Sequence, residues 1–306
     1  METKIFEFDT EDQKKLHSIL WIPDVEPCAV LQIAHGMTEH IDRYEEMAKE
    51  LTSHGIIVAG FDLRGHGRWD KENNCASFGK GGWNKTLTDI DGFGKYLREQ
   101  YPDLPLTLMG FSLGSFLVRD YLQNYPCVAS QVAITGCGDQ PSALLSVLKM
   151  LVSVQIKIHG FDCSSRLVRK LSFEMYNKNF QPERTKYDWL CSDQEQVDLY
   201  MADSLCKKDI SCGLFWQLLD AMQRTGQDTA YEKWNKDIPI LLMSGSQDAV
   251  GDFGKGVARL KGKMKKGGLK HVTMKMLPNA RHDFLHEYES KDAEKAFKII
   301  EMFITD

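Results

Sequence analysis

Between residues 29 and 138, apolar runs alternate with segments that have the periodicity of amphipathic helices. The apolar runs are AVLQIAHG, IIVAGFDLRGHG, PLTLMGFS and CVASQVAITGCG, and a helical pattern follows each of the first three. Strands that are apolar on both faces must be covered on both faces, and alternation with helices makes such a sheet parallel. The chain is therefore restricted to the α/β class.

The alternation is interrupted once. Helical patterns dominate from residue 141 to residue 226, and strands and helices then alternate again to the C-terminus. We expect an α/β core made of residues 1–140 and 227–306, with a helical insertion over residues 141–226. Ser192, followed three residues later by Glu195, has the capping-box spacing and predicts a helix start within the insertion.

The stretch GFSLGS places Ser112 where an apolar strand ends and a helix begins. Gly110 and Gly114 permit a sharp turn there, which would lift the hydroxyl above the sheet and point the amino end of the next helix at it. Ligands of open α/β sheets bind at the carboxyl ends of the strands. Ser112 is therefore a candidate nucleophile, and the alternative is an ordinary N-cap serine in a tight turn.

A serine hydroxyl needs a base and a group that orients the base. The strand pattern IPILLMSGSQD ends in Asp248, and the pattern HVTMKMLPNARHD leads to His282. Both follow Ser112 in the order that this nucleophile turn requires. We expect His282 to be the base and Asp248 the acid. Weaker candidates, which we set aside, are His17, His271, His286, Asp252 and Asp283.

An oxyanion hole would need two backbone N–H groups. The Leu113 N–H follows the nucleophile, and the loop after the strand AVLQIA offers Gly36 and Met37. Gly36 allows close backbone approach, so we expect the N–H groups of Met37 and Leu113 to hold the oxyanion. His35 is expected to brace this loop.

Charge and cysteine spacing bear on whether the protein binds nucleic acid and on the compartment in which it is found. The net charge is −5, which gives no general attraction to the phosphates of nucleic acid. The eight cysteines are scattered without a CxxC pair, which favours reduced thiols, and the charged N-terminus lacks the apolar core of a signal peptide. We expect a soluble cytoplasmic protein that does not bind nucleic acid.

The motifs HGMTEHIDRY, FDLRGHG, GFSLGS, GSQDAVG and NARHD, in this order, resemble those of the α/β-hydrolase superfamily, and within it the monoacylglycerol lipase and lysophospholipase group. The resemblance implies a mostly parallel sheet of about eight strands with helices on both faces and a helical cap. It also implies the roles given above to Ser112, Asp248, His282, Met37 and Leu113. Four further motif residues would have structural roles: His40, Asp62, Arg64 and His66.

Two segments leave alternatives open. Residues 143–158 are apolar except for a narrow stripe of Ser and Lys, so a helix there could pack on the core, line an acyl pocket or face lipid. From Val152 onward the alternation also suits a strand. Residues 255–270 carry seven Lys or Arg and no acid, which is typical of a solvated helix face but could meet an anionic membrane.

These expectations combine into a serine carboxylester hydrolase that works through an acyl-enzyme on a monoacylglycerol or lysophospholipid-like ester, with no metal or organic cofactor. Transient contact with a lipid surface stays open, and the oligomeric state is not predicted. One alternative is an aminopeptidase or amidase, and the other is a non-catalytic receptor, since one fold serves many functions. In the aminopeptidase, a substrate ammonium would meet carboxylates of the insertion: Asp188, Asp193, Glu195 and Asp198.

Overall fold

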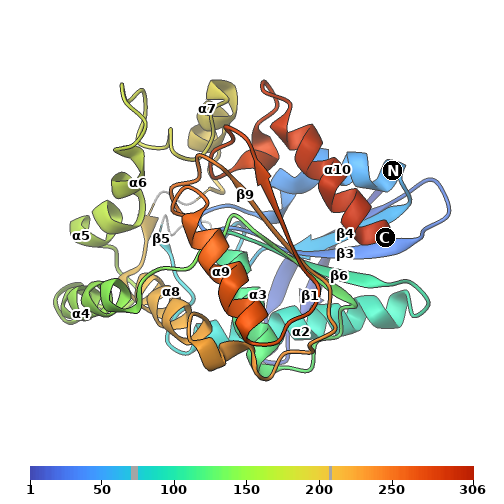
Figure 1. Cartoon of the computed structure of the whole chain (residues 1–306), viewed down its shortest axis with the longest axis horizontal. Coiled ribbons are helices and arrows are strands. Elements are labelled where there is room, and N and C mark those ends of the chain that lie inside the picture. The colour runs from blue at the N-terminus through green and yellow to red at the C-terminus, as the bar shows by residue number, and fades with distance from the viewer. Residues whose placement is uncertain (70–74, 207–208) are drawn as a thin grey trace.

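The structure is a computed structural model of the chain and describes residues 1–69, 75–206 and 209–306. Within these residues, one eight-stranded sheet forms the centre of the molecule (Figure 1). β1 pairs with β2 and β2 with β4 in antiparallel fashion, and every other neighbouring pair is parallel. The mostly parallel α/β sheet is confirmed. In spatial order the strands are β1 (Glu2–Asp9), β2 (Lys15–Ile22), β4 (Ile56–Phe61), β3 (Ala29–Ala34), β6 (Leu106–Phe111), β7 (Gln131–Thr135), β9 (Ile240–Gly245) and β10 (Val272–Leu277).

Helices cover both faces of this sheet, because its central strands are buried along their whole length. One apolar cluster includes the inner sides of α1 (Glu45–Ser53) and α10 (Asp292–Thr305). The other includes the inner sides of α2 (Gly82–Gln100), α3 (Leu113–Asn124) and α9 (Lys255–Lys266). The short turns η1 (Ile41–Tyr44), η3 (Asp228–Tyr231) and η4 (Phe284–His286) complete the core.

The elements between β7 and β9 are mostly helical and gather on one side of the sheet, at the left in Figure 1. The short strand β8 of this segment pairs in parallel with β5 (Cys75–Ala76), a second sheet that the sequence did not predict. The elements are α4 (Ser142–His159), α5 (Arg166–Arg169), the π-helical turn η2 (Lys170–Glu174), α6 (Met175–Asn177), α7 (Gln194–Ala202), β8 (Asp209–Ile210) and α8 (Cys212–Thr225).

The predicted capping box at Ser192 is wrong. Helix α7 begins at Gln194, and its N-cap is Asp193, whose carboxylate accepts the N–H groups of Glu195 and Gln196. The Ser192 hydroxyl instead donates to the Glu287 carboxylate, which also accepts the Ser192 N–H at 3.0 Å. A partner nearly a hundred residues away therefore removes this serine from the helix terminus.

Residues 142–159 form a helix throughout, so the alternative of a strand from Val152 is wrong. The polar stripe of α4 faces the protein. Ser146 accepts from the Gln223 amide at 2.8 Å, Lys149 pairs with Asp220, and Ser153 accepts from the Trp216 indole at 3.0 Å. Leu145 and Val152 are buried beside this stripe, but most of the other apolar side chains of α4 are turned outward, and the exposed ones are Leu144, Val147, Met150, Leu151, Val154 and Ile158.

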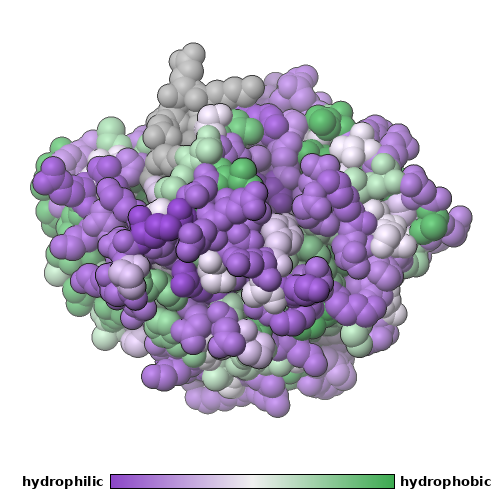
Figure 2. Space-filling model, turned by 90° about the horizontal axis from the view of Figure 1, so that it is seen from above, coloured by the Kyte–Doolittle hydropathy of each residue, from purple (hydrophilic) through white to green (hydrophobic). Residues whose placement is uncertain are grey.

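Among the described residues, one helix has the length and the apolar composition needed to cross a membrane, and it is α4. Only 11% of this segment is buried, which distinguishes it from a core helix. Seen from above, most of the surface is hydrophilic, and one of the larger apolar areas runs along the left margin, the side on which the helices between β7 and β9 lie (Figure 2).

Helix α9 differs from α4, because its apolar side faces the core and its charged side faces outward. Val257, Leu260 and Met264 are buried against the core, and the basic side chains face outward. Lys266 pairs with Asp228, and Lys270 lies 2.7 Å from Asp237. The basic run therefore forms a solvated face with acidic partners from its own chain.

Candidate active site

Ser112 lies in a sharp turn between β6 and α3. Its φ of 51° and ψ of −113° lie outside the regions that L-residues favour, and its N–H donates to Thr135 O at 3.0 Å. A Cβ at Gly110 would lie 2.4 Å from Gly114 O, and one at Gly114 would lie 1.9 Å from Ala34 O. Both glycines are therefore required by close backbone packing around the strained serine.

Three side chains from loops at one edge of the sheet form a hydrogen-bonded chain. Ser112 Oγ lies 2.9 Å from His282 Nε2, and His282 Nδ1 lies 2.9 Å from Asp248 Oδ1. An ionised carboxylate only accepts, so Nδ1–H donates to Asp248 and leaves Nε2 to accept from Ser112. The structure brings together the three residues that the sequence selected. β9 ends three residues before Asp248, and β10 ends at Leu277, so the predicted strand up to His282 is too long.

Burial and the hydrogen bonds among Ser112, His282 and Asp248 shift the pKa values of His282 and Asp248 in opposite directions. Burial by itself would raise the pKa of the Asp248 carboxyl, but His282 and the Ser244 hydroxyl, which donates at 2.8 Å, hold that pKa below its usual value. Burial would likewise lower the pKa of His282, yet the Asp248 carboxylate outweighs it and raises the pKa above 6.5. The imidazole is therefore a stronger base than an isolated histidine.

The residues set aside as acid or base have other partners. Asp252 pairs with Arg259 at 3.0 Å. Asp283 pairs with Arg43 at 2.9 Å and with His286 at 2.8 Å. These contacts leave Asp248 as the carboxylate bound to His282.

The loop after β3 approaches Ser112 and is held by its own polar groups. His35 Nε2 accepts the Leu63 N–H at 2.9 Å, and Nδ1 donates to Gly36 O at 2.7 Å. His35 therefore braces the loop, as expected, and burial lowers its pKa to about 4, which keeps it neutral. Met37 lines the same cavities as Ser112, and Leu113 lines one of them. The two predicted oxyanion-hole positions thus flank the serine.

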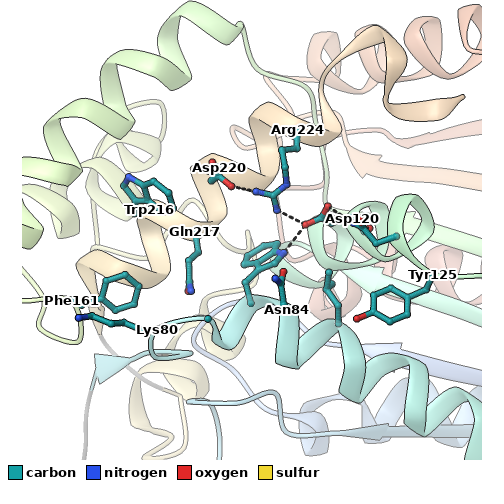
Figure 3. A pocket seen from close by; sticks show the side chains of 13 residues that line it. Lys80, Asn84, Asp120, Tyr125, Phe161, Trp216, Gln217, Asp220 and Arg224 are labelled. Carbon is teal, nitrogen blue, oxygen red and sulfur yellow. Dashed lines mark hydrogen bonds and ion pairs between the residues drawn. The ribbon is translucent and has the colours of Figure 1, made fainter. Parts of the chain in front are cut away.

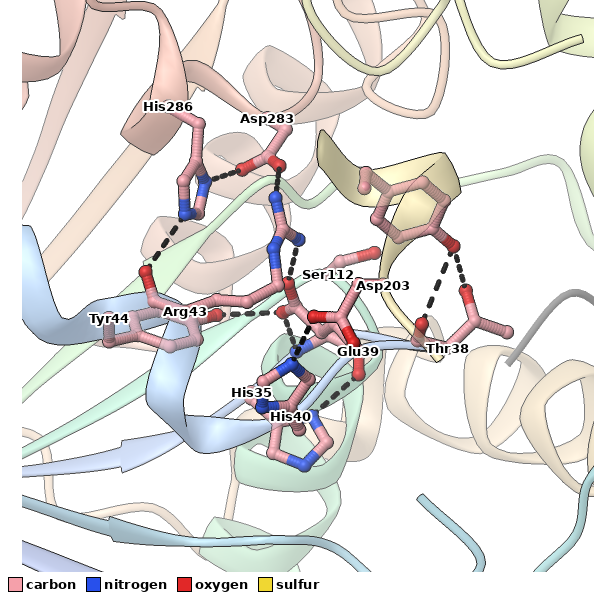
Figure 4. A network of polar contacts seen from close by, with 12 residues as sticks. His35, Thr38, Glu39, His40, Arg43, Tyr44, Ser112, Asp203, Asp283 and His286 are labelled. Atoms are coloured by element: carbon pink, nitrogen blue, oxygen red, sulfur yellow. Dashed lines mark hydrogen bonds and ion pairs between the residues drawn. The ribbon is translucent and has the colours of Figure 1, made fainter. Parts of the chain in front are cut away.

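A buried ionic network lies behind this loop (Figure 4). The Glu39 carboxylate accepts from the Gly36 N–H, the Tyr44 hydroxyl and the Arg43 guanidinium. Arg43 continues the network to Asp283. Sequence reasoning missed these residues as a group, although HGMTEHIDRY and NARHD contain all of them, because only folding brings the two motifs into contact.

Two cavities meet at Ser112. The larger, about 260 Å³, has mostly apolar walls from α4, α8 and the segment around η2, including Leu148, Leu171 and Phe215. The smaller, about 30 Å³, also has mostly apolar walls, to which Thr38, Glu39 and Arg43 add polar groups. Three residues line both cavities: Met37, Ser112 and Trp189. No sequence pattern predicted a role for Trp189, because the segment between residues 141 and 226 carries no recognisable motif.

A larger groove of about 790 Å³ lies elsewhere, between α2, α3 and α8 (Figure 3). Arg224 bridges Asp120 and Asp220 in its wall, and Trp83 donates to Asp120 at 2.8 Å. Its charged wall groups are thus mostly paired with one another. The groove contains none of the predicted site residues, so its size does not make it the candidate active site.

The four motif residues expected to be structural form bonds within the scaffold. Asp62 accepts the N–H groups of Ile41 and Arg68, and Arg64 pairs with Asp12 and Asp89. His66 bonds to Arg64 O at 2.9 Å. Within the described ranges, neither these three residues nor His40 line the two cavities at Ser112.

Among the residues that the structure describes, two groups of side chains are close enough to hold a metal ion: His40 with Asp203 and Cys206, and His40 with Asp42 and Asp62. Both depend on His40, whose ring nitrogens already bond to Asp42 at 3.0 Å and to Asp203 at 2.7 Å. Cys206 is unbridged, like the other seven cysteines. Neither group touches Ser112 or His282.

Comparisons with known proteins agree with this geometry. The family model described as serine aminopeptidase S33 (Hydrolase_4) matches residues 25–289. Monoglyceride lipase from Mus musculus is 27% identical over 91% of this chain and 87% of its own, and monoacylglycerol lipase from Mycolicibacterium smegmatis is 26% identical over 89% and 87%. A carboxyl esterase from Bacillus coagulans, solved in complex with glycerol, superposes with a TM-score of 0.85 at 23% identity over 99% of both chains.

Proposed function

Because the chain belongs to the Hydrolase_4 (serine aminopeptidase S33) family of α/β-hydrolases, we propose that it is a serine carboxylester hydrolase acting on monoacylglycerol-like esters. One observation carries the proposal: the Ser112, His282 and Asp248 chain opens onto an apolar cavity of about 260 Å³, and Thr38, Glu39 and Arg43 lie beside the serine in the wall of a second, much smaller one. A lipid ester has an apolar half and a hydroxylated half. Its acyl chain is apolar, and its alcohol carries hydroxyl groups.

In the proposed mechanism, His282 Nε2 takes the Ser112 proton as the hydroxyl attacks the ester carbonyl. Asp248 holds the imidazole tautomer and stabilises the imidazolium. The N–H groups of Met37 and Leu113 hold the tetrahedral oxyanion. His282 then protonates the departing alcohol. In the second half of the reaction His282 takes a proton from water as the water attacks the acyl-enzyme, and it returns the proton to Ser112 as the carboxylic acid leaves. The route uses no metal or organic cofactor.

The apolar cavity is the proposed acyl site. Its walls include Leu145 and Leu148 of α4 and Leu218 of α8, and it begins at Ser112. Each methylene that moves from water into such a cavity contributes about 0.8 kcal/mol. The sequence similarity to monoglyceride lipases from a mouse and a bacterium supports a lipid ester over a small one.

Two alternatives have less support. An aminopeptidase would need a carboxylate for the substrate ammonium, but in the described structure Asp188 accepts from Thr185, Asp193 caps α7 and Asp198 pairs with Arg184. None of these carboxylates lines the cavities at Ser112. A non-catalytic receptor would have no use for a strained serine bonded to a buried histidine and aspartate.

We further propose that the segment 141–226 is a cap over the site and that α4 meets a lipid surface transiently. The outward apolar side of α4 supports lipid contact, since exposed apolar side chains that cluster in this way mark interaction sites. The inward residues of the same helix, Leu145 and Leu148, would meet the acyl chain. One helix would thus link lipid surface and acyl site.

Labelling with a fluorophosphonate probe tests the nucleophile, and hydrolysis of 1-octanoylglycerol tests the activity. We expect the wild-type protein to be labelled and active, and Ser112→Ala to lose both properties while it keeps its circular dichroism spectrum. Labelling that persists in Ser112→Ala would place the nucleophile elsewhere. Labelling without turnover of any ester or aryl amide would favour a receptor, and preference for aminoacyl naphthylamides would favour the aminopeptidase.

A further inference from the structure

A carboxylate in the loop after β3 bonds back to the backbone of that loop. The buried Glu39 side chain accepts the N–H of Gly36, three residues earlier, and closes residues 36–39 into a small ring (Figure 4). A Cβ at Gly36 would lie 2.6 Å from the nearer carboxylate oxygen, so glycine leaves the room that this bond needs. Within the ring, Thr38 has a φ of 63°, a left-handed conformation that β-branched residues rarely adopt. Such a conformation persists only where surrounding contacts hold it, and the bond from Gly36 to Glu39 is one of them.

The same ring contains a backbone N–H proposed for the oxyanion hole. The Met37 N–H shares a trans peptide group with the C=O of Gly36, and this C=O accepts from His35 Nδ1 at 2.7 Å. The N–H and C=O of a trans peptide point in opposite directions, so the bond from His35 fixes the direction of the Met37 N–H. That N–H donates to no acceptor among the described residues. Glu39 holds the other peptide group of Gly36, so the unused donor is fixed from both sides of that glycine.

The carboxylate of Glu39 also reaches the loop of the proposed base. Its second oxygen accepts from the guanidinium of Arg43, which donates to Asp283 at 2.9 Å. Asp283 directly follows His282 in the sequence. The Tyr44 hydroxyl donates to the first carboxylate oxygen at 2.9 Å. One carboxylate and one guanidinium thus link the loop of the oxyanion donor to the loop of the base, and both loops must act on the same tetrahedral carbon.

Stability alone does not account for this ion pair. The side chains of Glu39 and Arg43 are 3% and 12% exposed. Removing two charges from water costs about as much as their attraction returns, so buried pairs often contribute little net stability. A carboxylate bound by three donors is nevertheless held in one position. A fixed position is what an oxyanion hole requires, because its donors must be in place before charge develops.

We propose that Glu39 is a positioning residue of the reaction, which holds the Met37 N–H in the direction in which that group binds the oxyanion. Through Arg43, it also ties this donor to the loop of the base. The inference rests on the proposed function, because it names the side chain that positions the oxyanion hole of that reaction. Glu39 acts through the backbone and not by contact with the reacting atoms.

The rival role for Glu39 is direct contact with the alcohol half of a substrate. Glu39 lines the smaller cavity at Ser112, which holds only about 30 Å³. Its two oxygens already accept three hydrogen bonds, which leaves little capacity for a substrate hydroxyl. The two roles differ in what they predict. Positioning affects every ester equally, whereas contact affects only esters of hydroxylated alcohols.

Glu39→Gln tests the proposal with little change in side-chain shape. The amide has one acceptor oxygen, so it cannot serve both the Gly36 N–H and Arg43. We expect kcat to fall about tenfold to a hundredfold with KM nearly unchanged, less than the hundredfold to thousandfold that loss of an oxyanion donor itself costs. The fall should be equal for 1-octanoylglycerol and propyl octanoate, which share an acyl chain. An unchanged kcat, or a loss confined to the glyceryl ester, would overturn the proposal.

An analogue of the tetrahedral state separates this inference from the proposed function. Ser112 adds to the carbonyl carbon of octyl trifluoromethyl ketone, His282 takes the serine proton, and the carbonyl oxygen becomes an oxyanion. The inhibition constant of this ketone should rise in Glu39→Gln by the factor by which kcat/KM falls. An unchanged constant would overturn the inference. If the wild-type protein binds the ketone but hydrolyses neither ester, and Glu39→Gln weakens that binding, the proposed function alone is wrong.

Asp89→Asn is the matched control. Asp89 is also buried and accepts from Arg64 at 2.8 Å, but it lines neither cavity at Ser112. We expect its replacement to leave kcat and the inhibition constant unchanged in folded protein, as thermal unfolding verifies. If it lowers kcat as much as Glu39→Gln does, the effect belongs to loss of any buried ion pair, and the proposal is wrong.

Arg43→Lys provides a second measurement if Glu39→Gln does not fold. Lysine keeps the positive charge but lacks the planar fork that bonds Glu39 and Asp283 together. We expect kcat to fall about threefold to tenfold on both esters, the worth of one hydrogen bond, with KM nearly unchanged. An unchanged kcat in folded Arg43→Lys protein would overturn the proposal.

Discussion

The edge of the sheet at Ser112 and helix α4 differ in how completely they cover their side chains. At the edge, polar groups are buried and bonded to one another, as in the chain from Ser112 through His282 to Asp248. On α4, polar groups bond to α8, while apolar groups such as Val147 and Met150 face outward, 52% and 62% exposed. The first region is complete within this chain. The second leaves an apolar surface that the described residues do not cover.

The two regions should therefore respond differently to substitution. Buried polar groups at a reacting centre must meet in a fixed geometry, so changes there should cost rate and little else. An exposed apolar helix face costs little stability to change, so its effect should appear only with a lipid partner. The predictions below test this contrast, from the largest expected effect to the smallest.

Replacing Asp248 with Asn should give the largest effect, a loss of up to about ten-thousandfold in kcat, because the amide stabilises the wrong imidazole tautomer. Steady-state hydrolysis of an octanoyl ester measures it. Asp252→Asn is the control, since Asp252 pairs with Arg259 and not with His282. A mild Asp248→Asn and a crippling Asp252→Asn would reverse the assignment of the acid.

Lowering the pH should reduce kcat/KM by about tenfold per unit below the pKa of His282, because the base must be neutral to accept the Ser112 proton. Asp248 raises the pKa of His282 above 6.5, so the protonated form persists to higher pH and the acid limb should have its midpoint above pH 6.5. A pH profile of kcat/KM on an uncharged ester measures this. A midpoint below pH 6 would contradict a carboxylate-bound imidazole.

Two adjacent residues of α4 face opposite sides of the helix, so they allow the proposed acyl site and the outer surface to be tested separately. Leu148 lines the apolar cavity, whereas Val147 is exposed. Wild-type kcat/KM should rise about fourfold per methylene until the cavity is full. Leu148→Asp should flatten this series from acetyl to lauroyl esters, because a charge in the apolar cavity opposes chain burial.

Val147→Asp is the matched control and should keep the rise with chain length on soluble esters, and Lys157→Ala should do the same. Thermal unfolding must first establish that Leu148→Asp is folded. Equal loss on acetyl and lauroyl esters by a folded Leu148→Asp protein would exclude this cavity as the acyl site.

The smallest effect is expected for the outward side of α4. Met150→Ser should change the free energy of unfolding by no more than about 0.5 kcal/mol, because the side chain is already in water. It should nevertheless weaken co-sedimentation with phosphatidylcholine vesicles. Leu260→Ala, on the buried side of α9, should instead cost about 2–5 kcal/mol. Vesicle binding that is unaffected by Met150→Ser and Val154→Ser together would exclude this face as the contact.

Local patterns predicted which side chains meet at the edge of the sheet near Ser112. A serine between two glycines, at a change from strand to helix, constrains its own backbone, so Ser112 could be found from the six residues GFSLGS and the patterns on either side of them. Asp248 and His282 follow strands that must end at the same edge of a parallel sheet. Residues that act through distant partners could not be found in this way. The place of Trp189 at the site and the contact of Arg43 with Asp283, 240 positions away in the sequence, depend on segments that only folding brings together.

The sequence by itself determined the α/β class, the alternation of strands and helices along the chain, and the three residues that meet at the edge of the sheet, because each is specified by periodicity or by a short motif. Only the tertiary structure decided which side of an amphipathic helix faces inward. α9 buries Leu260 and Met264, as a solvated helix should, whereas α4 turns its polar stripe inward. The reason is that Asp220 and Gln223 of α8 offer that stripe hydrogen bonds and an ion pair, and no pattern within α4 contains its partner.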